Sequence, residues 1–171
     1  LQHVAGTPLP ELAAQYVETF DLRRRCSPYL TYYAYGDTRR RGVALVEMKQ
    51  AYRAVGLELA DEELPDHLAV VLECASGPDD GAREAGLRLL LAHRAGLELL
   101  RLALLDAGSP WAGAVVAVCA TLPPLEGDDR DAVARLAAEG PPGEEVGLDP
   151  SLALAATAPY ALDPSTTGAD R

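Results

Sequence analysis

The sequence is poor in aromatic and basic side chains. Aromatic residues make up 5% of the 171 residues, and Lys49 is the only lysine. With so few aromatic residues, the core must be built mainly from Leu, Val and Ala, which favours helices over strands. The net charge is −11, so the chain repels nucleic-acid phosphates and prefers a basic partner. This balance argues against a nucleic-acid-binding protein.

Cysteine clusters, catalytic motifs and long apolar runs are also missing. Cys26, Cys74 and Cys119 lie far apart and form no metal-ligand spacing, so we expect reduced, mostly buried thiols in a cytoplasmic protein. The sequence contains no phosphate-binding glycine loop, dinucleotide fingerprint, nucleophile elbow or His-Glu-x-x-His motif. The longest uncharged apolar run, residues 111–122, is too short to span a bilayer. We therefore expect no catalysis, no cofactor and no membrane insertion; a zinc ion held by distant residues is the alternative left open.

The spacing of the apolar residues predicts an all-α protein. Helices are expected over residues 8–20, 37–55, 65–76, 80–106, 110–121 and 128–139. The segment 80–106 contains Gly86 and Gly96, each costing about 1 kcal/mol relative to alanine in a helix interior. It forms either one long helix or two with a break near Gly96. Residues 110–121 are nearly all apolar, which predicts the central, most buried helix.

Turn residues mark the boundaries of these segments. Thr7, Ser27 and Ser109 each precede a proline, which predicts a capping hydroxyl followed by proline at the first helical position. Residues after Gly140 are rich in Pro, Gly, Ala and Thr and lack periodicity. The sequence thus predicts one helical domain over residues 1–140 and a poorly structured tail over residues 141–171.

Asp66 and His67 are the most informative polar pair. They follow an acidic stretch and precede apolar residues with helical spacing, so they are expected at the start of a short amphipathic helix. Neighbouring side chains on a helix point about 100° apart, which excludes a dyad on one face. One interpretation places both at the rim of a groove, where each meets a different part of a partner. The alternative is a helix-capping Asp beside an ordinary surface His.

Acidic residues next to apolar helix stripes indicate what such a groove would bind. The acidic residues are Glu58, Asp61, Glu62, Glu63 and Asp66. A groove with apolar walls and an acidic rim suits an amphipathic helix that carries Arg or Lys. The two Arg triplets, residues 23–25 and 39–41, are interpreted as solvated or ion-paired groups, with anion binding as the alternative.

Three segments resemble a known family. Residues 15–21 (Gln-Tyr-Val-Glu-Thr-Phe-Asp), residues 35–42 around Gly36-Asp37-Thr38-Arg39, and residues 56–68, which end in Leu-Pro-Asp-His-Leu, are similar to the NarJ-type chaperones. These are the delta-subunit assembly factors of respiratory nitrate reductase, within the wider TorD-like family. The resemblance extends over residues 8–122.

The resemblance implies an all-α bundle of the TorD/NarJ type, lacking the family's N-terminal helices. It implies a cytoplasmic chaperone that binds the N-terminal segment of the nitrate reductase catalytic (alpha) subunit until the molybdenum cofactor is inserted, before membrane docking. It assigns peptide recognition to Asp66 and His67. Apolar periodicity adds a groove lining, formed by Tyr16, Phe20, Tyr52, Leu64, Leu68 and Leu72.

Other functions remain open. A chaperone for another molybdoenzyme, a protein that handles the molybdopterin nucleotide, and a structural helical module that dimerises through the Tyr-rich segment 29–35 are the alternatives. For the leading hypothesis we expect a monomer or weak dimer.

Overall fold

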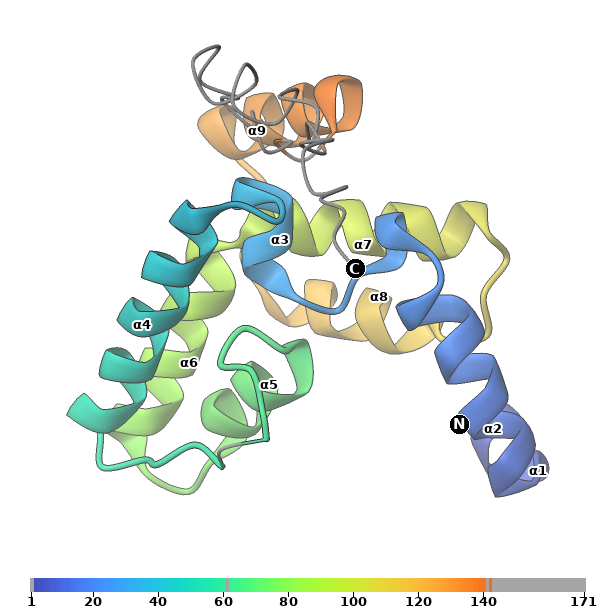
Figure 1. Ribbon diagram of the computed structural model, residues 1–171, viewed down its shortest axis with the longest axis horizontal. Helices are drawn as coiled ribbons and strands as arrows, with labels where there is room; N and C mark the ends of the chain where they lie inside the picture. Colours follow the sequence, from blue (N-terminus) through green and yellow to red (C-terminus); the bar gives the residue numbers. More distant parts are fainter. Residues whose placement is uncertain (1, 61, 141, 143–171) are drawn as a thin grey trace, which may run out of the picture.

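The computed structural model describes residues 2–60, 62–140 and 142. Within these residues all regular elements are helical, which confirms the predicted all-α class (Figure 1). The predicted tail, apart from Pro142, lies outside the described residues. In chain order the elements are α1 (Gln2–Gly6), α2 (Leu9–Tyr16), the π-helical turn η1 (Val17–Asp21), the 3-10 turn η2 (Arg24–Cys26), α3 (Leu30–Tyr35), α4 (Arg39–Ala54), α5 (Leu68–Ser76), α6 (Asp80–Ala92), α7 (Arg94–Asp106), α8 (Ala112–Thr121) and α9 (Gly127–Glu139).

The helix at the centre of the core is α7. Leu97, Leu100 and Leu104 are fully buried along one side of it, and α3, α8 and α9 pack around it (Figure 1). The prediction that residues 110–121 form the most buried helix is wrong. Only one side of α8 is covered, and Val116 is 37% exposed. An uninterrupted apolar run therefore shows that a helix has no polar face, but not how many neighbours cover it.

The segment 80–106 forms two helices, as one of the two alternatives predicted. The break lies at His93, which ends α6 and precedes α7, so Gly96 falls inside α7 and not at the break. Helix α5 packs against α6, and α4 lies beside α6 on the same side of the molecule (Figure 1). These three helices form the part of the bundle that carries the Asp66 segment.

The hydroxyl groups of Thr7, Ser27 and Ser109 do not cap helices, so that prediction is wrong. Thr7 donates to a backbone carbonyl, and the other two accept a backbone N–H two residues further on, before the helix begins. The observed side-chain caps are His67 for α5 and Asp79 for α6. The prolines stiffen the turns that precede the helices, because a proline fixes its own φ angle.

All three cysteines are buried free thiols, as predicted. Burial raises the pKa of each thiol above its usual value, so the neutral form is favoured and none has the character of a nucleophile. Among the described residues, no group of three or more His, Cys, Asp or Glu is arranged to hold a metal ion. No helix in the described part of the chain is both long and apolar enough to cross a membrane.

Candidate binding site

The segment that carries Asp66 and His67 is tied to the segment before α3. Leu30 N–H donates to the Asp66 carbonyl at 2.9 Å, and Leu68 N–H donates to the Pro28 carbonyl at 2.9 Å. These bonds make an antiparallel bridge between Tyr29 and His67. A turn at Asp66 and the bridge at His67, directly before α5 begins, therefore position the pair.

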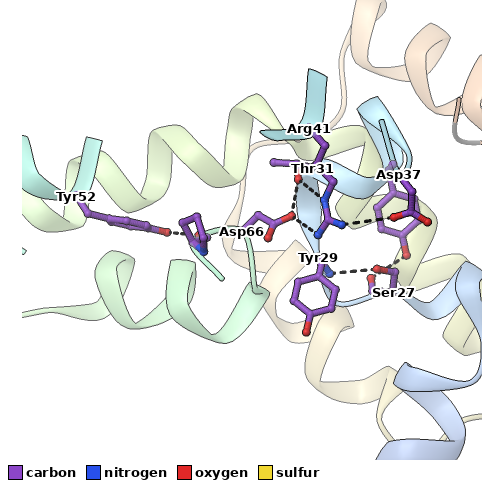
Figure 2. Close-up of polar contacts among 9 residues, drawn as sticks. Ser27, Tyr29, Thr31, Asp37, Arg41, Tyr52 and Asp66 are labelled. Atoms are coloured by element: carbon purple, nitrogen blue, oxygen red, sulfur yellow. Dashed lines mark hydrogen bonds and ion pairs between the residues drawn. The ribbon is translucent and has the colours of Figure 1, made fainter. Parts of the chain in front are cut away.

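The Asp66 carboxylate is fully buried, with 0% exposure. Its Oδ2 accepts a hydrogen bond from Thr31 Oγ1 and another from Arg41 Nη2 at 3.2 Å (Figure 2). Among the described residues its Oδ1 has no hydrogen-bond partner. The interpretation that places Asp66 at an exposed groove rim is therefore wrong; Asp66 directly precedes His67, the N-cap of α5, but its side chain is buried. Asp66 lies in a turn closed by a hydrogen bond from His67 N–H to the Leu64 carbonyl at 3.1 Å, and its side chain points inward.

Arg41 supplies the positive charge beside this carboxylate. Its Nε donates to Thr31 Oγ1 at 3.2 Å, and its Nη1 lies 3.5 Å from Asp37 Oδ1. Its guanidinium carbon lies 5.4 Å from the centre of the Tyr29 ring (Figure 2). The side chain is 17% exposed, so Arg41 is the ion-paired group expected as one interpretation of the Arg triplets.

His67 points the other way, toward the surface, where it is half-buried. Its Nδ1 accepts the Ala69 N–H at 3.3 Å, and its Nε2 lies 3.2 Å from the Tyr16 hydroxyl. Because Nδ1 accepts, the neutral ring carries its proton on Nε2 and donates it to the Tyr16 oxygen. The Tyr16 hydroxyl proton is then available to an acceptor outside the pair. Burial, then the charge of Asp21, raise the pKa of Tyr16, so the hydroxyl stays protonated.

We call the contact between Tyr16 and His67 the Tyr16–His67 rim. Aromatic side chains extend this rim toward α8. The Tyr16 ring lies 4.8 Å from that of Phe20 and 6.4 Å from that of Trp111, measured between ring centroids. The His67 ring meets the Tyr29 ring edge-on, with centroids 5.3 Å apart. The structure thus brings Tyr16, Phe20 and His67 together, and it adds Trp111, which sequence reasoning missed. Trp111 directly precedes α8, and nothing in its local sequence pattern connects it to Tyr16.

A separate apolar groove lies between α5, α6 and α8. It has a volume of about 630 Å³. Leu72 is one of its lining residues; the predicted role of Leu72 in peptide binding stays a prediction. The other lining residues are Ala75, Ser76, Arg83, Glu84, Leu87, Leu90, Ala117, Val118, Thr121 and Leu122. Leu87 is 41% exposed at its wall. Sequence reasoning did not assign Leu87 to a groove, because the contribution of α8 is a matter of tertiary packing.

Some of the remaining predicted residues are buried and others are exposed. Tyr52 and Leu68 are buried, at 3% and 8% exposure, and Tyr52 donates its hydroxyl to the Pro65 carbonyl at 2.8 Å. They therefore do not line an open groove. Leu64 is 42% exposed. Of the acidic stretch, Glu58, Glu62 and Glu63 are exposed, and Asp61 lies outside the described residues.

A second cavity of about 730 Å³ lies between η2, α3, α7 and α9. Tyr32, Leu99, Leu102 and Leu136 supply apolar lining, and Arg24, Arg25 and Asp106 supply charge. Arg25 Nη1 lies 3.2 Å from Asp106 Oδ2, so part of the positive charge here is already paired. This cavity is one alternative location for a ligand in the described part of the chain.

Comparison with known proteins gives a consistent family. A family model described as the nitrate reductase delta subunit matches residues 1–117. The nitrate reductase-like protein NarX of Mycobacterium tuberculosis is 46% identical over 109 residues, which is 64% of this chain and 16% of the relative. The probable nitrate reductase molybdenum cofactor assembly chaperone NarW of Escherichia coli is 38% identical over 88 residues, covering 51% of this chain and 38% of the relative. The corresponding probable chaperone NarJ of Bacillus subtilis is 37% identical over 68 residues, covering 40% and 37%. The chain thus spans well under half the length of each of these relatives.

Proposed function

Because the chain belongs to the nitrate reductase delta subunit family, we propose that it is an assembly chaperone for a respiratory nitrate reductase. It binds the N-terminal segment of the catalytic subunit and holds that segment for insertion of the molybdenum cofactor, before the enzyme docks at the membrane. It acts in the cytoplasm, as a monomer or weak dimer, and catalyses no reaction. The E. coli and B. subtilis relatives, which are described as such chaperones, support this proposal.

The observation that carries the proposal is the apolar groove between α5, α6 and α8. Its charged lining residues are Arg83 and Glu84, and most of the others are Leu, Ala and Val. An amphipathic helix laid into such a groove buries its apolar face there, which is the helix-in-groove mode of recognition. Buried apolar area then supplies most of the affinity.

The rim at Tyr16 and His67 supplies polar contacts near the N-terminal ends of α5 and α8. His67 and Trp111 directly precede α5 and α8, whereas the groove is lined by the second halves of both helices. A client helix of several turns can therefore contact the groove and the rim together. In this proposal Tyr16, Phe20, Leu64, His67 and Leu72 face the client. The predicted site residues Tyr52, Asp66 and Leu68 support them from within.

Calorimetric titration with a synthetic peptide tests the proposal. The peptide copies the first residues of the nitrate reductase catalytic subunit, and saturable binding is expected. Leu87→Ala removes apolar area from the groove wall at a 41% exposed position, where the fold tolerates truncation. The loss of about 1 kcal/mol of apolar contact corresponds to a roughly fivefold weaker affinity.

Leu102→Ala is the matched control. Leu102 is 42% exposed and lines the second cavity, so its truncation leaves the groove intact and affinity unchanged. The reverse result, in which only Leu102→Ala weakens binding, moves the client to the second cavity. No binding of the peptide at high micromolar concentration by the unaltered protein refutes the proposed function.

A further inference from the structure

The Asp66 carboxylate is closed off from any client by residues of this chain. It is 0% exposed, and the groups around its Oδ2 come from α3 and α4. A peptide side chain that pairs with Oδ2 would have to displace Arg41, which is itself held by Thr31 and Asp37. Burying a second cation here without removing the first would place two like charges against one buried carboxylate, which is costly.

We infer that Asp66 is a positioning residue, that Arg41 is its internal counter-ion, and that the clasp formed by Asp66, Arg41 and Thr31 holds the Tyr16–His67 rim in its client-binding arrangement. The inference rests on the proposed function, and it assigns the roles of Arg41 and Thr31. The client contacts His67 and does not contact Asp66.

The clasp acts on His67 through the backbone. The Asp66 carboxylate accepts a hydrogen bond from the Thr31 hydroxyl, and the Asp66 carbonyl accepts one from Leu30 N–H. Asp66 is thus attached to α3 through both its side chain and its backbone. His67 follows immediately and bridges to Tyr29, whose ring also lies under the Arg41 guanidinium (Figure 2). Release of the Asp66 side chain therefore loosens both strands of the bridge, and with them the ring that meets the Tyr16 hydroxyl.

Two peptides distinguish positioning from direct contact. The first copies the N-terminal segment of the catalytic subunit, and the second carries Gln at each of its Arg and Lys positions. If Asp66 positions the rim, Asp66→Asn weakens both peptides by the same factor, roughly 2- to 30-fold. If Asp66 contacts a basic side chain of the client, Asp66→Asn weakens only the first peptide and abolishes the preference between the two. That second result overturns the inference.

The sign of the Arg41→Gln effect is an independent test. A clasp predicts weaker binding of both peptides, with Arg41→Lys recovering part of the loss because it retains the charge. If the Asp66 carboxylate instead pairs directly with an arginine of the client, the opposite is expected, because removal of its internal counter-ion would strengthen binding of the basic peptide. Arg40→Gln, at an exposed position of the same helix, is the matched control and leaves both affinities unchanged.

The rim is also observed without peptide. In the full chain, Asp66→Asn and Arg41→Gln should shift the His67 imidazole signals in NMR spectra, whereas Arg40→Gln should not. Circular dichroism confirms that each variant is folded; Arg41, being partly exposed, gives the decisive variant if Asp66→Asn unfolds. Unchanged His67 signals in a folded Arg41→Gln variant overturn the inference. Failure of the unaltered protein to bind either peptide refutes the proposed function, and the positioning role falls with it.

Discussion

Replacement of Gly86 by alanine tests how closely α5 and α6 are packed. Gly86 lies in α6 and faces Ala75 of α5. A Cβ atom at Gly86 would lie 2.6 Å from Ala75 Cα and 2.8 Å from Ala75 Cβ, below the 3.0 Å that real Cβ contacts respect. The obstructing atoms belong to the backbone and its first side-chain atom, so no rotamer change relieves the clash. The two helices must move apart.

Two effects of opposite sign decide the magnitude. In a helix without neighbours, Gly→Ala stabilises by about 1 kcal/mol. Overpacking of a core costs about 1–3 kcal/mol, and a clash with backbone falls at the upper end of this range. The net expectation is a loss of about 2 kcal/mol of unfolding free energy. For a chain of this size the loss lowers Tm by about 4–8 °C.

Thermal and urea unfolding followed by circular dichroism measure this loss. Gly42→Ala is the control, because Gly42 lies in α4 and a Cβ there has no neighbour within 4 Å. It should raise the stability by about 0.5–1 kcal/mol. A Gly86→Ala variant as stable as the unaltered protein would refute the close approach. Because Ala75 also lines the groove, Gly86→Ala should in addition weaken peptide binding, and Gly42→Ala should not.

Three further substitutions test other parts of the structure. Tyr52→Phe removes the buried bond to the Pro65 carbonyl and should lower the unfolding free energy by about 1–2 kcal/mol in urea titrations. Burial lowers the pKa of His93 below its ordinary 6.5, although the charge of Asp66 opposes the shift. Below pH 6.5 the unfolded chain therefore binds a proton at His93 more readily than the folded chain does, and the unfolding free energy should fall as the pH drops. The fall should be less steep in His93→Gln. The hydrogen bond from Arg101 lowers the pKa of Glu98 below 4.5, so its stabilisation is present above pH 4.5 and is lost on further acidification; Glu98→Gln should flatten Tm against pH in that range.

Apolar spacing predicted the longer helices, but it gave no range for α1 or α3 and did not give the order of burial. The repeat of Leu97, Leu100 and Leu104 is visible in the sequence, and these residues form the buried side of α7. Gly96 was expected to weaken this helix. The helix α7 nevertheless continues through Gly96. A Cβ atom at Gly96 would lie 2.9 Å from the Tyr33 Cβ, so the glycine permits the close approach of α3. Tertiary contact outweighs helix propensity at this position, and no local pattern reveals the contact.

The sequence did not predict the geometry around Asp66. The sequence analysis grouped Asp66 with the acidic residues that precede it, because a sequence pattern contains only neighbours along the chain. Its actual partners, Arg41 and Thr31, are 25 and 35 residues away. Likewise, the extended backbone at His67 depends on pairing with Tyr29, a contact that helix periodicity cannot predict. Leu72 belongs to an apolar stripe that is local to α5, and it lines the groove between α5, α6 and α8; its contact with a peptide stays a prediction.

Under the proposed function, the burial of Asp66 changes which charges would act on a client. Asp66 and Arg41 form an ion pair, so together they contribute little field outside the molecule. The acidic rim therefore reduces to exposed carboxylates such as Glu58, Glu62 and Glu63. Exposed charges are screened over roughly 8 Å at physiological salt, and such charges affect the association rate more than the lifetime of a complex. Apolar contacts in the groove carry no charge, so salt does not screen them. Client affinity should then depend mainly on residues such as Leu87, and the acidic stretch should affect mainly how fast a basic segment finds the groove.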